Sequence, residues 1–188
     1  MSGYSGTPLP KKLGIREGHR VAAVAAPRRL AEILVPWPSG AQLEGVDEVT
    51  GLASAEGRFD VILLFAGAGA GADDAASPDD AASPDDAASP DDAASPDDAA
   101  SPDDGLADAI AGVSDRLEVD GGLWVAWAKM KSPLFSGLKD SHVREAGLRV
   151  GLVDNKVCAL DDDWSGLRFV FRREDRARVR AERGEGTP

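Results

Sequence analysis

The chain has 188 residues, enough for one domain with tails, and a formal net charge of −12. Twelve of its 33 acidic residues lie in one repeat over residues 73–104 that contains no Lys or Arg. Outside it 21 acids balance the 21 bases, so the body of the chain as a whole is no electrostatic match for nucleic acid, and we expect no nucleic-acid partner. A single cysteine excludes an intrachain disulfide, and neither a signal peptide nor an apolar run of the ~20 residues that span a membrane is present, so we expect a cytoplasmic protein without membrane contacts.

The first third of the chain predicts alternating strands and helices. Residues 1–19 form an arm rich in turn formers, and residues 20–26 form a short buried strand. A helix over residues 27–35 begins at a proline and ends before a Pro-Trp-Pro stretch. Residues 41–54 hold one or two short strands without a clear place in the sheet. Residues 59–66 form a second strand that is buried on both faces, because its apolar side chains do not alternate with polar ones.

Residues 67–101 predict a disordered insert, made of a glycine-rich lead and DDAASP hexads. The recurring proline prevents a continuous helix, and no large apolar residue is present to offset the entropy lost on ordering. Each Ser-Pro-Asp-Asp has the pattern of a helix start, but only the last copy, residues 101–104, precedes a helical pattern. We interpret it as one native cap that was duplicated in tandem, with the surplus copies looped out.

Two functions compete with the interpretation of the repeat as a solvated acidic linker. Calcium binding by the aspartate pairs requires converging ligands held by a turn, and the hexads contain no glycine to form one. Phosphorylation of Ser77 and its equivalents has no further support in the sequence. We favour the linker and assign no metal site.

Beyond the insert the sequence predicts a helix ending near Leu117, one more buried strand and a hairpin. Residues 120–122, Asp-Gly-Gly, form a turn before a strand over residues 123–128, and a short helix follows. Two further strands flank an Asp-Asp-Asp-Trp-Ser turn as an antiparallel hairpin, whose second strand alternates apolar residues with arginines. Residues 174–188 are polar and unpatterned, which indicates a flexible tail.

This order of elements predicts an α/β fold. Strand, helix, strand, helix, strand favours a parallel sheet with right-handed crossovers. We therefore expect a three-layer, Rossmann-like parallel sheet with a C-terminal antiparallel β-hairpin, interrupted by a disordered acidic repeat. The single domain covers residues 20–66 and 102–173.

The strand order, the DGGLWVAW strand after a helix and the terminal hairpin resemble the layout of class I S-adenosylmethionine-dependent methyltransferases. In this resemblance FDVILLF and LWVAW match the fourth and fifth strands of the family. The family's cofactor loop follows the first strand and is glycine-rich, because the backbone approaches the methionine and ribose closely. The loop here is VAAVAAPRRL, without glycine, and the glycines at 67, 69 and 71 follow a different strand.

A second resemblance covers nearly all of the chain outside the repeat. Four motifs agree in order: GYSGTPLPKKLGIREGHRV, FDVILLF, DGGLWVAW and GLVDNKVCALDDDWSGLRFVFRRED. Together they resemble a small bacterial family known as domain of unknown function 3052. This resemblance implies no established activity or cofactor.

Cations follow two of the three buried strands, at the carboxyl ends where open parallel sheets bind ligands. These are Arg28 and Arg29 after the first strand and Lys129 and Lys131 after the third. Such cations are suited to a small anionic ligand such as a phosphate or a carboxylate. The alternative is that they are ordinary solvated residues.

The hairpin gathers polar and aromatic residues that are typical of protein interfaces. We predict an interaction patch for a protein partner, made of Asp154, Asn155, Lys156, Trp164 and Arg168. Cys158 lies between Val157 and Ala159, and we interpret it as a packed residue rather than a nucleophile.

Together these features favour a degenerate methyltransferase-like domain that binds a small anionic ligand or a protein partner, with no catalysis assured and no cofactor assigned. The alternative is an S-adenosylmethionine-dependent methyltransferase with an atypical cofactor loop.

Deleting residues 73–96, which begin with the first hexad, tests the interpretation of the repeat. We expect the thermal unfolding midpoint to stay unchanged, because a solvated linker contributes no packing to the fold. Differential scanning calorimetry of the full chain and the deletion variant measures this. A clearly lower midpoint in the deletion variant would show that the repeat is part of the folded structure.

Overall fold

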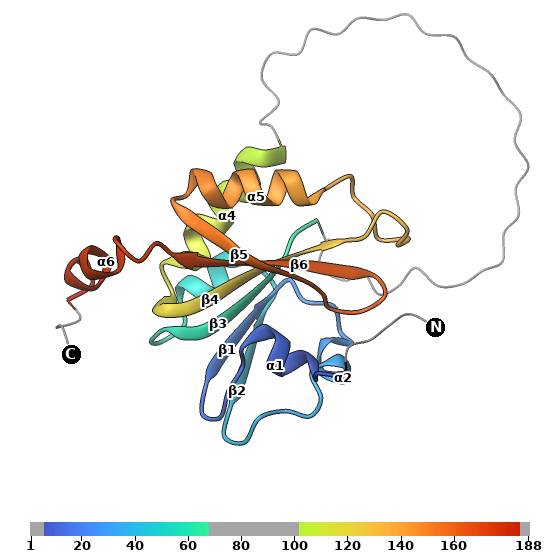
Figure 1. Cartoon of the computed structure of the whole chain (residues 1–188), viewed down its shortest axis with the longest axis horizontal. Coiled ribbons are helices and arrows are strands. Elements are labelled where there is room, and N and C mark those ends of the chain that lie inside the picture. Colours follow the sequence, from blue (N-terminus) through green and yellow to red (C-terminus); the bar gives the residue numbers. More distant parts are fainter. Residues whose placement is uncertain (1–5, 68–101, 185–188) are drawn as a thin grey trace, which may run out of the picture.

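A computed structural model describes residues 6–67 and 102–184 (Figure 1). For residues 102–104 it describes the backbone only. The predicted disorder of the acidic repeat lies outside these residues. Six strands form one sheet in the order β2-β1-β3-β4-β6-β5. The strands are β1 (Arg20–Val24), β2 (Gln42–Val46), β3 (Phe59–Phe65), β4 (Leu117–Ala128), β5 (Leu152–Ala159) and β6 (Trp164–Phe171). Strands β1 to β4 pair in parallel and β6 pairs antiparallel with both β4 and β5, so the expected fold class is confirmed.

Strand β3 is central because its side chains enter two separate cores. Ile62 and Leu64 belong to a cluster on one face of the sheet, whereas Val61, Leu63 and Phe65 belong to a cluster on the other. Successive side chains of a strand point to opposite faces, so a strand covered on both sides needs an unbroken apolar run. The run FDVILLF meets this requirement.

Helices cover both faces of the sheet and make the three layers (Figure 1). One core is closed by α3 (Val49–Ala53), α4 (Pro102–Ser114) and α5 (Asp140–Arg149), and the other by α1 (Leu9–Leu13) and α2 (Leu30–Ile33). Within residues 6–67 and 102–184 no helix is long and apolar enough to cross a membrane.

The arm before β1 is fastened to the sheet. Leu13 is fully buried, and the indole Nε1 of Trp124 on β4 donates a hydrogen bond of 2.9 Å to its carbonyl oxygen. A buried indole N–H needs such an acceptor. Helix α1 is therefore part of the second core.

Several local expectations differ from the structure. The helix expected over residues 27–35 is the single turn α2, and the unplaced residues 41–54 form the edge strand β2 and helix α3. The turn expected at residues 120–122 is wrong, because β4 runs through it with an irregular register opposite β3. A side chain at Gly121 would lie 2.7 Å from the Asp60 carbonyl oxygen, so the glycine serves a close approach of two strands rather than a turn.

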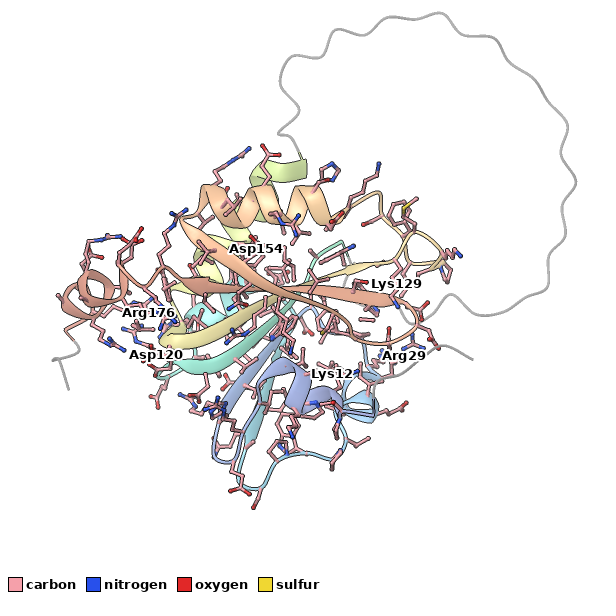
Figure 2. The ribbon with its side chains drawn as sticks, in the orientation of Figure 1. Lys12, Arg29, Asp120, Lys129, Asp154 and Arg176 are labelled. Atoms are coloured by element: carbon pink, nitrogen blue, oxygen red, sulfur yellow. The ribbon has the colours of Figure 1, made fainter. Side chains whose placement is uncertain are left out.

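The expected flexible tail contains a helix of seven residues, α6 (Arg176–Glu182). Its position relative to the sheet is set by charge, since no residue of α6 is buried. Arg176 Nη1 and Arg180 Nη2 lie 3.0 and 2.5 Å from the carboxylate oxygens of Asp120 on β4 (Figure 2).

Two glycines in helices test how tightly α5 packs on the sheet. A Cβ at Gly147 would overlap the fully buried ring of Phe169 on β6, whereas a Cβ at Gly105 on α4 meets nothing within 4 Å. We expect Gly147→Ala to destabilise the fold by about 1–3 kcal/mol through overpacking. Gly105→Ala is expected to stabilise it by up to about 1 kcal/mol, because alanine is the better helix former.

Urea unfolding of the two variants and the parent chain measures both effects. Because the chemical change is the same at both positions, only the packing around each glycine differs. Equal midpoints for the two variants would contradict the close contact between α5 and β6.

Candidate functional site

A cavity of about 680 Å³ opens at the edge of the sheet where β1, β2 and β3 end. The parallel strands bring their carboxyl ends to this edge, which is where open α/β sheets bind ligands. Helix α4 and the segment before α5 complete the walls. The lining residues are Val24, Ala25, Asp47, Glu48, Val49, Leu64, Phe65, Ala66, Gly67, Gly105, Leu106, Ala109, Ser136, Gly137, Leu138 and His142.

The backbone turns sharply at two positions on the cavity wall. Ala25 follows β1 with a φ of 51°, in the left-handed region that glycine normally occupies, and its N–H donates to the Val46 carbonyl oxygen at 2.9 Å. Gly67 follows β3 with a φ of 77°, and a Cβ there would overlap the Ser136 hydroxyl oxygen. The loop after β1 therefore makes a glycine-like turn without a glycine.

The charged groups of the cavity are carboxylates. Asp47 and Glu48 follow β2 directly and are exposed at the cavity, where the Glu48 carboxylate accepts a hydrogen bond of 3.2 Å from the Thr50 hydroxyl. No Lys or Arg is among the lining residues. Most of the remaining wall is apolar. The cavity therefore favours a ligand that carries positive charge or hydroxyl donors over an anion.

His142 is the one histidine among the lining residues. It lies in the first turn of α5, and its Nδ1 accepts a hydrogen bond of 3.4 Å from the Lys139 backbone N–H. This contact caps the start of the helix.

The four cations predicted to bind an anion do not line this cavity. Arg29 makes an ion pair with Asp163, and its Nη2 lies 3.6 Å from the Asp161 carboxylate. Lys129 Nζ donates a hydrogen bond of 2.5 Å to the Asp161 carbonyl oxygen, and Figure 2 shows both cations at the same end of the sheet. These two cations therefore hold the turn between β5 and β6. Arg28 and Lys131 are exposed nearby, and an anion site here stays a prediction.

The residues of the predicted hairpin patch are divided between the two faces of the sheet and its edge. Asp154 pairs with Arg144 of α5 at 3.1 Å, whereas Lys156 Nζ donates to the Lys12 carbonyl oxygen in the N-terminal arm at 2.8 Å. The Arg168 guanidinium donates to the Asn155 side chain at 3.4 Å. A protein partner for this region stays a prediction.

Trp164 was wrongly assigned to the surface patch. Its side chain is 1 % exposed and packs edge-on against Phe65, with 5.1 Å between the ring centroids. Trp164 is the first residue of β6, and its ring contacts Phe65 at the end of β3. Its large apolar ring is therefore buried in the core and is not available to a partner.

Cys158 has the environment of a packed thiol. Burial raises its pKa above the ordinary value, and the nearby charges of Lys156 and Lys12 only partly oppose this. A thiol with a raised pKa forms little of the thiolate that nucleophilic chemistry needs. The residue is thus a poor nucleophile at neutral pH.

The residues that line the cavity were missed by the sequence reasoning, except for the strand ends themselves. Asp47 and Glu48 are detectable only if residues 42–46 are recognised as a strand, since their position directly after a strand is the signal. That strand is an edge strand with exposed side chains, so its hydrophobic pattern is weak. His142 and Ser136 carry no local pattern that marks them.

No protein-family model matches the chain, so its resemblance to domain of unknown function 3052 stays a prediction. No curated protein matches it either.

Solved structures share the fold at low sequence identity. The pyocyanin biosynthetic protein PhzM aligns with a TM-score of 0.51 and 10% identity over 87% of this chain, which spans 53% of PhzM. A ribosomal protein L11 methylase from Lactobacillus delbrueckii subsp. bulgaricus gives a TM-score of 0.48 at 12% identity, covering 88% of this chain and 75% of the methylase. A SAM-dependent methyltransferase from Aquifex aeolicus gives 0.46 at 12% identity, with 85% of each chain covered. The likeness to PhzM is one of fold alone.

Proposed function

We propose that the chain binds S-adenosylmethionine in the cavity at the carboxyl ends of β1, β2 and β3 and acts as a methyltransferase. The observation that carries this proposal is the pair of carboxylates, Asp47 and Glu48, directly after β2 in a cavity whose lining contains no Lys or Arg.

The chemistry of the lining suits this cofactor. Carboxylates at the end of a strand beside the first strand are suited to accept hydrogen bonds from the hydroxyls of a ribose. A sulfonium cation is favoured by the same negative charge, and an adenine ring by apolar walls such as Leu64 and Leu106. The volume of about 680 Å³ is within the range of small-molecule sites, about 300–1,000 Å³.

The loop after β1 also fits, although its sequence departs from the family pattern. A glycine-rich loop lets the backbone approach a ligand closely. Ala25 adopts the left-handed conformation in its place, with its N–H fixed on Val46. Ala25 thus makes a turn of the kind that glycine favours, with one added methyl group.

When bound, S-adenosylmethionine supplies an electrophilic methyl group. The chain's own residues have simpler tasks. Asp47 and Glu48 hold the donor through charge and hydrogen bonds, and the apolar walls exclude water from it. Ser136 and His142 supply polar groups for hydrogen bonding on the opposite wall.

A second candidate is binding without methyl transfer, to a small anion or a protein partner. It is favoured by Pro27, Arg28 and Arg29, which follow Ala25 where the family has further loop glycines. The pairing of Arg29 with the hairpin turn weighs against it, because this cation is then directed away from the cavity.

Binding of S-adenosylmethionine and its weakening by Asp47→Asn test the proposal. We expect micromolar binding to the parent chain by isothermal titration calorimetry. The variant should bind roughly tenfold to a hundredfold more weakly, because a hydrogen bond to a charged group contributes about 1.5–3 kcal/mol. Ala109→Phe, which fills the cavity from α4, should abolish binding.

Asp162→Asn is the matched control, since Asp162 is an exposed carboxylate on the hairpin turn and does not line the cavity. It should bind as the parent chain does. Circular dichroism confirms that each variant folds. Absence of binding to the parent chain, or equal loss in Asp47→Asn and Asp162→Asn, would refute the proposed site.

The two candidates are separated by transfer of a labelled methyl group to a panel of phenol, amine and thiol acceptors. Label in any acceptor supports the methyltransferase. Tight binding of S-adenosylmethionine without transfer across the panel would favour the second candidate.

A further inference from the structure

A second hollow, of about 400 Å³, lies at the opposite edge of the sheet, where β1, β3 and β4 begin. Five segments of the chain meet there. The lining residues are Gly14, Arg16 and His19 of the N-terminal segment, Asp60 and Val61 of β3, residues 118–121 of β4, Arg168 of β6 and Arg180 of α6. We refer to it as the arginine hollow.

One part of the wall, at Gly121, is backbone without a side chain, and Gly122 follows it on β4. Gly121 lies so close to β3 that a Cβ would be 2.7 Å from the Asp60 carbonyl oxygen. At Gly122 a Cβ would lie 2.5 Å from Arg168 Nε and 2.6 Å from its Nη2. The Arg168 guanidinium therefore rests directly on the bare backbone of β4, in a place that any other residue at 122 would block.

Arg168 is held there without a carboxylate of its own. Its hydrogen bond to the Asn155 side chain is long, at 3.4 Å, and no ion pair joins it to an acid of the described chain. Burial lowers its pKa, and the positive charges of Arg176 and Arg16 lower it further. A half-buried arginine beside like charges is destabilising unless an anion compensates it.

The acids around the hollow already have partners. The Asp120 carboxylate binds Arg176 and Arg180, and the Asp60 carboxylate accepts the Arg20 backbone N–H at 2.8 Å. Figure 2 shows the first of these pairs, with Arg176 beside Asp120 at the α6 end of the sheet. Glu118 is engaged as well.

Arg16 is the second cation available to a ligand. It is exposed at the rim, and within residues 6–67 and 102–184 no hydrogen bond or ion pair engages its side chain. Together Arg168 and Arg16 leave two positive charges at one small polar space, which the carboxylates of Asp60, Glu118 and Asp120 also line.

We propose that the arginine hollow binds a phosphate group, carried by a soluble phosphate ester or by a lipid headgroup. Two guanidinium groups from different walls match the charge of a phosphate monoester and its several acceptor oxygens, to which arginine donates in pairs. The missing side chain at Gly122 leaves the space that the Arg168 guanidinium occupies beside the hollow. This site lies at the opposite edge of the sheet from the proposed cofactor cavity and does not depend on that function.

Titration of the full chain with inorganic phosphate, followed by backbone amide NMR at constant ionic strength against chloride, tests the site. We expect saturable shifts at Gly121 and Gly122. Arg168→Gln should weaken phosphate binding at least tenfold, and Arg16→Gln should weaken it less. The control is Arg178→Gln, an exposed arginine of α6 that pairs with Asp175 and Glu182 and does not line the hollow.

The source of the phosphate is distinguished by a second arm with phosphatidylcholine vesicles containing phosphatidic acid. Binding to these vesicles that is lost in Arg168→Gln, but not in Arg178→Gln, indicates a lipid headgroup. Saturation by free phosphate without vesicle binding indicates a soluble ester. A parent chain that responds to neither, or responses equal in Arg168→Gln and the parent chain, would overturn the proposal.

The affinity of Arg168→Gln for S-adenosylmethionine separates the two proposals. It should equal that of the parent chain, because Arg168 does not line the cofactor cavity. An unchanged circular dichroism spectrum shows that the variant is folded. Failure of the phosphate site thus leaves the result for the cofactor cavity intact.

Discussion

The structure depends on the burial of β3 on both faces. Five consecutive apolar residues of this strand, Val61 to Phe65, are each at most 3 % exposed and divide between two cores. Fully burying one such side chain contributes about 1.5–3 kcal/mol, so this strand is a large part of the hydrophobic driving force. Its two ends also fix the two hollows of the molecule, because Phe65 and Ala66 line the cavity at one edge and Asp60 and Val61 line the arginine hollow at the other.

Charge is divided between these two edges in a consistent way. The edge at the carboxyl ends of the strands exposes Asp47 and Glu48 without a lining cation, whereas the opposite edge leaves Arg16 and Arg168 without bound carboxylates. The remaining charges mostly serve structure. Arg29 and Lys129 fasten the hairpin turn, and Asp120 holds α6. The charge of the ligand that we expect at each edge therefore depends on which side chains there are already paired.

The sequence was sufficient for the elements with strong apolar patterns and insufficient for those fixed by contacts. The run FDVILLF identifies β3, and the alternation of Leu167, Phe169 and Phe171 with arginine and valine identifies β6. Asp-Gly-Gly at 120–122 has the composition of a turn, but the glycines there serve the close approach of β3 and Arg168. Trp164 has the composition of an interface anchor, but its place beside Phe65 buries it.

The candidate site was the harder part to predict. Its carboxylates follow an edge strand with a weak pattern, and its other polar groups come from segments that only the tertiary fold brings together. Two of the four cations that the sequence indicates at the strand ends, Arg29 and Lys129, contact the hairpin turn instead of the cavity. Local spacing identifies a sheet edge, and it does not decide which side chains face inward there.

The left-handed Ala25 has a consequence for how β2 and the cavity are linked. An alanine in this conformation costs roughly 1 kcal/mol relative to a right-handed one, so its neighbours must impose it. The neighbour that does so is Val46, the last residue of β2, through the Ala25 N–H. Detachment of this outermost strand would release the loop and carry Asp47 and Glu48 away from it in the same event. The lining of the cavity and the outermost strand of the sheet are thus joined through this one hydrogen bond.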